Sequence, residues 1–119
     1  MTNGRVKGMR FQSDLAKRWR DGGLFPDAWS TQQPRGGPRD GADISGTPGW
    51  SVEAKAVESI NLWNAMEQAE AAAGDDKAVV VAKKNRQGIL VCMRLETWED
   101  MLCQLRRSTH QTETQSGAG

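Results

Sequence analysis

Asp43, Glu53 and Lys55 bring two carboxylates and a lysine together in a short stretch of the chain. Two carboxylates that face each other across a strand pair repel and weaken the sheet, whereas a divalent cation between them would reverse that interaction. Mg²⁺ prefers oxygen ligands and is usually held by one or two carboxylates, which leaves room for substrate phosphate. A lysine beside such a centre can orient or deprotonate a water, or stabilise the negative charge that develops on a phosphate. The three residues therefore predict metal-dependent hydrolysis of a phosphodiester, although an ordinary solvated strand face can also carry a Glu-x-Lys pair.

The pattern around these residues predicts a β-hairpin that places them on one face. Residues 42–45 and 50–56 suit two strands, and the Gly-Thr-Pro-Gly segment between them suits a turn. With the turn centred near Pro48, Asp43 lies opposite Glu53. Because successive side chains alternate between the two faces of a strand, all three candidate residues then share one face, and the neighbouring apolar residues share the other.

Several segments together resemble the PD-(D/E)xK nuclease superfamily, in particular the Holliday junction resolvase-like endonucleases of archaea and of phages of actinobacteria. The similarity extends over about residues 8–95. Its parts are the opening of a first helix at 8–12, a first catalytic strand and turn at 40–49, a second catalytic strand at 51–55, a helix around 63–69, and a strand at 78–84 that ends in lysines.

The resemblance implies a restriction-endonuclease-like core and cleavage of branched DNA by a homodimer, with Mg²⁺ as cofactor and Mn²⁺ able to substitute. It also implies that Asp43 and Glu53 bind the metal and that Lys55 acts in catalysis. Many members carry a glutamate in the first helix that helps the metal site, and this chain has Gln12 at the matching position. Gln12 can offer a carbonyl oxygen but no charge, or Asp14 could substitute for it.

Further polar residues are candidates for supporting roles. Gln68, on the helix after the catalytic strands, and Lys83 could both reach the site, or both could be solvated surface residues. Candidate contacts to DNA phosphate are basic side chains, since such contacts position nucleic acid without reading its sequence: Arg10 in the basic N-terminal region, Arg35 and Arg39 in a loop rich in Gly and Pro, and Lys84 beside Lys83.

Hydrophobic periodicity predicts the elements that must position these residues. Helices are predicted at 9–21, at 59–73 and from 97 onward, with a short extended segment within 24–32, the hairpin, and strands at 78–82 and 88–93. This order predicts an α/β fold with a central mixed β-sheet flanked by helices, in the order α-β-β-β-α-β-β-α. We expect Ser59 to cap the second helix, and Thr97 with Asp100 to form a capping box for the third.

Length and composition limit the remaining possibilities. The 119 residues suit a single nuclease domain over 1–106, and the polar residues 107–119 are expected to be disordered. A net charge of +1 does not by itself indicate a nucleic-acid binder, so DNA affinity must come from local patches. Cys92 and Cys103 are interpreted as reduced core residues, which favours a cytoplasmic location. No apolar stretch approaches the roughly 20 residues of a membrane span.

Three other functions remain open at this point. The chain could be a nuclease of the same fold that nicks or cuts linear DNA, or a catalytically inactive DNA-binding or structural protein, which the uncharged Gln12 would favour. It could also be a protein-interaction module that uses its tryptophan-rich faces. Trp19, Trp63 and Trp98 have the spacing of core or dimer-interface residues, whereas Trp29 and Trp50 are predicted to pack, with stacking on unpaired bases as the alternative.

Overall fold

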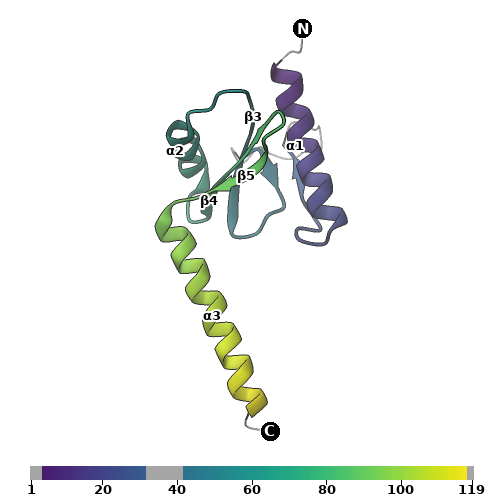
Figure 1. The fold of residues 1–119 in the computed structure, drawn as a ribbon. Helices are drawn as coiled ribbons and strands as arrows, with labels where there is room; N and C mark the ends of the chain where they lie inside the picture. The colour runs from purple at the N-terminus through teal and green to yellow at the C-terminus, as the bar shows by residue number, and fades with distance from the viewer. Residues whose placement is uncertain (1–3, 32–41, 118–119) are drawn as a thin grey trace.

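The chain forms an α/β fold around a five-stranded mixed sheet, as seen in a computed structural model that describes residues 4–31 and 42–117 (Figure 1). The strands lie side by side in chain order, β1 (Trp29–Ser30), β2 (Ile44–Ser45), β3 (Trp50–Ala56), β4 (Lys77–Lys84) and β5 (Gly88–Cys92). β3 and β4 are parallel, and the other neighbours are antiparallel. With α1 (Gly4–Asp21), α2 (Leu62–Ala73) and α3 (Leu95–Gly117), the element order confirms the predicted α-β-β-β-α-β-β-α arrangement.

The apolar run of β4 is buried on both faces of the sheet, as its composition predicts. Val79 and Val81 join the cluster formed with α1, while Ala78 and Val80 join the cluster formed with α2. Because side chains alternate along a strand, each face of the sheet is therefore assigned to one helix. α1 and α2 cover the two faces, and α3 leaves the body of the molecule (Figure 1).

The hairpin between β2 and β3 has the register that a turn centred near Pro48 predicts, because Ile44 pairs with Val52. Its turn is closed by the Thr47 hydroxyl, which donates a 2.8 Å hydrogen bond to the carbonyl oxygen of Trp50. Gly46 has φ of +80°, and a Cβ atom there would lie 2.1 Å from the carbonyl oxygen of Asp27. Glycine is therefore required at this position both by backbone conformation and by the close approach of the chain.

The helix ends differ from the predictions in their capping residues and lengths. Asn61, not Ser59, caps α2, and its side-chain oxygen accepts a 3.1 Å hydrogen bond from the Asn64 amide. α3 begins at Leu95, so Thr97 lies inside the helix and cannot cap it. α3 also continues to Gly117, so residues 107–117, expected to be disordered, are helical.

The two cysteines occupy different environments. Cys92 and Cys103 are both free, but Cys103 is exposed on α3, so its assignment to the core was wrong. Trp19, by contrast, packs against the α1-side cluster as predicted and meets Phe25 edge to face, with ring centroids 5.4 Å apart. Within residues 4–31 and 42–117, no helix combines the length and the apolar character needed to cross a bilayer.

Candidate active site on the hairpin

Asp43 and Glu53 lie next to each other on the face of the sheet that α2 covers. Ile44 belongs to the cluster with α1, so the preceding side chain of Asp43 points to the opposite face. Glu53 pairs with Val80, which packs against α2. The register of the hairpin places the two side chains opposite each other, and the charge of Asp43 raises the pKa of Glu53. The hairpin therefore brings together the two carboxylates that its spacing predicted would face each other.

The backbone of β3 holds the Asp43 carboxylate in place. Its Oδ2 atom accepts a 2.8 Å hydrogen bond from the amide nitrogen of Ala54, and the Asp43 amide donates to the carbonyl oxygen of Val52 at 3.0 Å. Asp43 thus bridges to β3 through both its backbone and its side chain. The carboxylate position is determined by the sheet itself rather than by a flexible loop.

Lys55 completes the group on the same strand face. Its Nζ atom lies 3.2 Å from Oε1 of Glu53, with side-chain exposures of 31% for the lysine and 12% for the glutamate. An ammonium group with this exposure remains accessible to a substrate phosphate while paired with a carboxylate that is mostly buried. Asp43, Glu53 and Lys55 are therefore assembled as the sequence predicted.

The electrostatics of the pair oppose full ionisation. Burial raises the pKa of Asp43, although the Ala54 amide and the Lys55 charge act against that rise. Burial also raises the pKa of Glu53, and the negative charge of Asp43 raises it further, while Lys55 acts in the opposite direction. Two carboxylates arranged so that charging both is costly form a site that a divalent cation would stabilise.

The two carboxylates suit a Mg²⁺ ion better than a metal whose ligands must all come from the protein. Mg²⁺ is commonly bound by one or two carboxylates together with waters and substrate phosphates. In the part of the chain that the structure describes, no group of three or more His, Cys, Asp and Glu side chains could hold a metal. Asp43 and Glu53, with their adjacent oxygens and mutual repulsion, would hold the ion.

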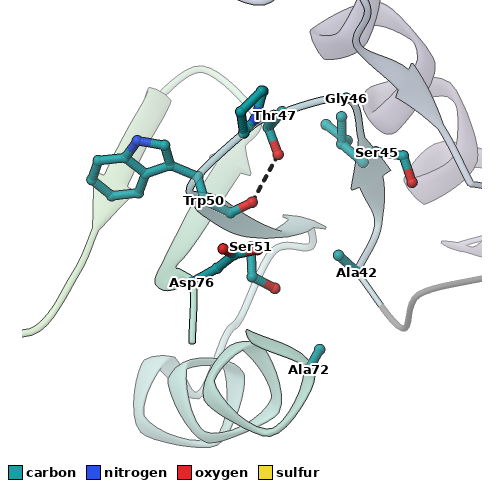
Figure 2. A pocket seen from close by; sticks show the side chains of 10 residues that line it. Ala42, Ser45, Gly46, Thr47, Trp50, Ser51, Ala72 and Asp76 are labelled. Carbon is teal, nitrogen blue, oxygen red and sulfur yellow. Dashed lines mark hydrogen bonds between the residues drawn. The ribbon is translucent and has the colours of Figure 1, made fainter. Parts of the chain in front are cut away.

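A cavity of about 280 Å³ lies at the turn end of the β2–β3 hairpin, where Ser51 of β3, Ala72 of α2 and Asp76 contribute to its lining (Figure 2). Ser51 precedes Glu53 by two residues and so shares its strand face. Its hydroxyl is buried without a hydrogen-bond partner in the described structure. Figure 2 shows Ser51 pointing from β3 toward the helix that carries Ala72, with Asp76 nearby. The Ser-x-Glu-x-Lys alternation in the sequence already places Ser51 on the same strand face as Glu53 and Lys55. It gives no reason, however, to distinguish Ser51 from an ordinary serine in a strand.

Two other cavities meet at Lys55 and contain predicted auxiliary residues. One, of about 220 Å³, is lined by Lys55 together with Gln68 and Asn64 of α2. The other, of about 260 Å³, is lined by Lys55, Lys83 and Lys84 among apolar side chains. The structure therefore brings Gln68 into the neighbourhood of Lys55, as the sequence suggested. Lys84, which the sequence proposed only as a contact to DNA phosphate, also borders a cavity with Lys55.

Lys83 and Gln12 are oriented away from the acidic pair. The ammonium group of Lys83 lies 5.9 Å from the centroid of the Phe11 ring, on the face that α1 covers, although the residue also borders the lysine-lined cavity. Gln12 is buried, and its Oε1 atom accepts a 3.3 Å hydrogen bond from the Ser30 hydroxyl of β1. This oxygen is engaged within the α1 side of the core, while Asp14, the suggested substitute, is exposed on α1.

Of the basic residues predicted to contact DNA, some are exposed on the described structure and others lie outside it. Arg10 is exposed on α1, and Lys84 is exposed at the end of β4. Arg35 and Arg39 lie outside the described residues. Trp50 packs at the edge of the α1-side cluster, with the ammonium group of Lys77 lying 5.5 Å from its ring centroid.

Comparison of the chain with protein-family models, with curated proteins and with solved structures finds no match. The functional assignment therefore depends on the geometry of the hairpin and on the residue pattern that it carries.

Proposed function

We propose that the protein is a Mg²⁺-dependent endodeoxyribonuclease that hydrolyses DNA phosphodiester bonds at the face formed by Asp43, Glu53 and Lys55. One observation carries the proposal: two partly buried carboxyl groups that face each other across the β2–β3 hairpin, with an accessible lysine 3.2 Å from one of them. A purely structural hairpin gains nothing from such a pair, because it weakens the sheet.

The residues of the site have different roles in the proposed reaction. Asp43 and Glu53 bind the cation, and the Ala54 amide keeps the Asp43 oxygen oriented. When bound, Mg²⁺ supplies charge neutralisation and polarises a phosphoryl oxygen. Lys55 positions the attacking water or stabilises the negative charge on the phosphate as the P–O bond to the leaving sugar breaks.

The basic surface next to the site supports a nucleic-acid substrate. Lys55 and Lys84 share a cavity at the end of β4, so the positive charge of the site continues outward along the strand. Phosphate contacts of this kind supply affinity that is independent of sequence and weakens with salt. Because residues 8–95 resemble resolvase-like nucleases, branched DNA is the first substrate that we propose.

The direct test is cleavage of a labelled four-way DNA junction with Mg²⁺ or Mn²⁺, beside a linear duplex of the same sequence. Glu53→Ala is the inactive control, and Glu58→Ala, an exposed glutamate outside the site, is the matched control. Paired cuts in the junction that Glu53→Ala abolishes and Glu58→Ala preserves would establish a resolvase. Cleavage of both substrates would instead identify a nuclease without branch preference. No cleavage of either by folded, metal-loaded protein would remove the catalytic proposal for these substrates.

A further inference from the structure

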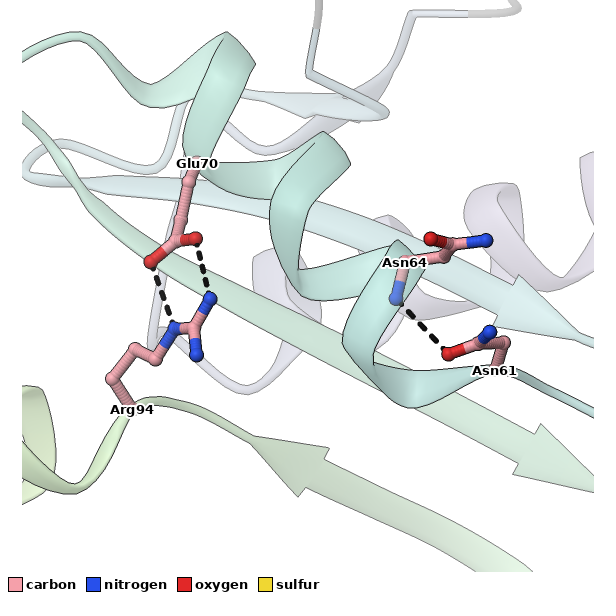
Figure 3. A network of polar contacts seen from close by, with 4 residues as sticks. All are labelled: Asn61, Asn64, Glu70 and Arg94. Atoms are coloured by element: carbon pink, nitrogen blue, oxygen red, sulfur yellow. Dashed lines mark hydrogen bonds and ion pairs between the residues drawn. The ribbon is translucent and has the colours of Figure 1, made fainter.

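α3 projects away from the sheet as a long helix without a partner in the described fold (Figure 1). At its root, Arg94, the residue before the helix, forms a bidentate ion pair with Glu70 of α2 at 3.0 and 2.9 Å (Figure 3). This exposed pair links the start of the helix to the body of the molecule. A solitary helix gains no stability from tertiary packing, and in water it is marginal by itself.

One side of α3 carries an apolar seam, which we define as Leu95, Trp98, Leu102 and Leu105. These residues are spaced three, four and three apart, which is the repeat of a coiled-coil contact. Leu95, Trp98 and Leu105 are 61%, 48% and 61% exposed. Leu102 is partly buried, and beyond the contact region at Leu95 no other helix or strand of the described structure lies against the seam (Figure 1). Its spacing is suited to packing against another helix.

The charges beside the seam change sign along the helix. Glu96, Glu99 and Asp100 lie in its first half, and Arg106 and Arg107 follow the seam's last leucine. An antiparallel copy of the same helix places the acidic part of one α3 beside the basic part of the other. A parallel copy would place like charges together, so the charge pattern favours an antiparallel pair.

The apolar surface continues from the seam onto the body. A cavity of about 420 Å³ at the root of α3 is lined by Leu62, Trp63 and Leu95, among others, and Trp63 is 73% exposed. In β5, the neighbouring edge strand, Ile89, Leu90 and Val91 are exposed. In an antiparallel pair, the far end of the partner's α3 runs back toward this surface, since each helix is about 34 Å long at 1.5 Å per residue.

We propose that a second copy of this chain covers the seam, by antiparallel pairing of the two α3 helices about a two-fold axis. The same patch then serves both subunits, as a closed two-fold interface requires. The proposal identifies the surface and the direction of pairing, and it does not depend on the proposed nuclease function.

The first test measures the molecular mass of the full chain by sedimentation equilibrium over a range of concentrations. We expect a monomer–dimer equilibrium for the unmodified chain. Leu102→Glu should raise the dimer dissociation constant at least about 100-fold, because the dimer buries two copies of this leucine. Gln104→Glu places the same charge on an exposed position outside the seam and should leave the constant nearly unchanged. A monomer at every concentration, or equal effects of the two substitutions, would overturn the proposal.

The second test examines the direction of pairing by exchanging charges. Glu99→Arg and Arg106→Glu should each weaken the dimer, and the double variant should restore it. The two residues are seven apart and so lie two turns from each other on one helix, which leaves contact between copies as the source of any restoration. Additive weakening in the double variant would exclude the antiparallel arrangement. Because these side chains project from α3 and not from the sheet, the fold of the sheet domain should be unchanged in each variant.

Discussion

Asp43→Asn should stabilise the protein without metal and make it less stable than the unmodified chain when Mn²⁺ is present. Without metal, the substitution removes the charge that opposes ionisation of Glu53 and leaves the Glu53–Lys55 ion pair intact. The asparagine oxygen can still accept the hydrogen bond from the Ala54 amide, and its NH₂ group can donate to Glu53. The variant therefore loses repulsion without losing the contacts that hold the hairpin.

The size of the effect follows from the position of the two carboxyl groups, which face each other across the hairpin. Two unit charges about 4 Å apart interact by about 4 kcal/mol at an effective dielectric constant of about 20. Lys55 and the Ala54 amide offset part of this repulsion, so we expect a net gain of about 1–2 kcal/mol in the free energy of unfolding. For a domain of this size, 1 kcal/mol corresponds to about 4–8 °C in Tm, so that gain raises Tm by about 4–16 °C. Mn²⁺ at about 100 times its Kd should add about 2.7 kcal/mol to the unmodified chain only.

The assay is thermal unfolding of both proteins with and without Mn²⁺, at several pH values, with Asp75→Asn as an exposed control of equal charge change. The pKa values of Asp43 and Glu53 are raised in the folded state, so folding binds protons. The metal-free, unmodified chain should therefore lose stability as pH rises from the ordinary carboxyl pKa of about 4 through the raised values. In Asp43→Asn, the free energy of unfolding should fall less steeply as pH rises. Equal Mn²⁺ stabilisation of the two proteins would refute the assignment of Asp43 as a ligand.

Other predictions concern catalysis, DNA affinity and the hairpin. Lys55→Met should lower the cleavage rate by about 10²–10⁴-fold while Mn²⁺ stabilisation persists; unchanged cleavage would exclude Lys55 from the reaction. Lys84→Ala should reduce the slope of log affinity against log salt by about 1 if this lysine contacts a phosphate, as measured by fluorescence anisotropy of labelled DNA. Gly46→Ala should destabilise the fold by at least about 1–3 kcal/mol in urea unfolding, because alanine meets both a positive φ and the Asp27 carbonyl. Ser51→Ala should be neutral or slightly stabilising, since the buried hydroxyl has no partner; a loss above about 1 kcal/mol would show that it makes a stabilising contact.

Local pattern was sufficient for the main elements and for the candidate site. The apolar run of β4 has one compatible environment, a strand buried on both faces, because no residue in it can be placed in water without cost. The β2–β3 register also follows from local information, since a short turn fixes which residues pair and alternation then fixes their faces. For this reason the spacing of Asp43, Glu53 and Lys55 along the chain is enough to predict that they share one face of the hairpin.

The predictions that were wrong concern features that depend on competition between neighbouring residues or between distant segments. Ser59 and Asn61 are both acceptable caps, and the one that is used depends on where packing of Met66 against β4 begins the helix. Lys83 and Lys84 necessarily point to opposite faces, but pairing of β4 with β3 decides which of them faces Lys55.

Taken alone, the sequence determined the order of the elements, the hairpin register and the grouping of two carboxylates with a lysine, because each follows from short-range periodicity and turn geometry. Only the tertiary structure decided that Gln12 bonds to Ser30 on the far face of the sheet, that Ser51 is buried without a partner, and that α3 projects with its apolar seam uncovered. These depend on which segments, distant in sequence, occupy the same space. A side-chain pattern shows that a face of a strand or helix will be buried. Only the packing of the whole chain decides which segment covers that face.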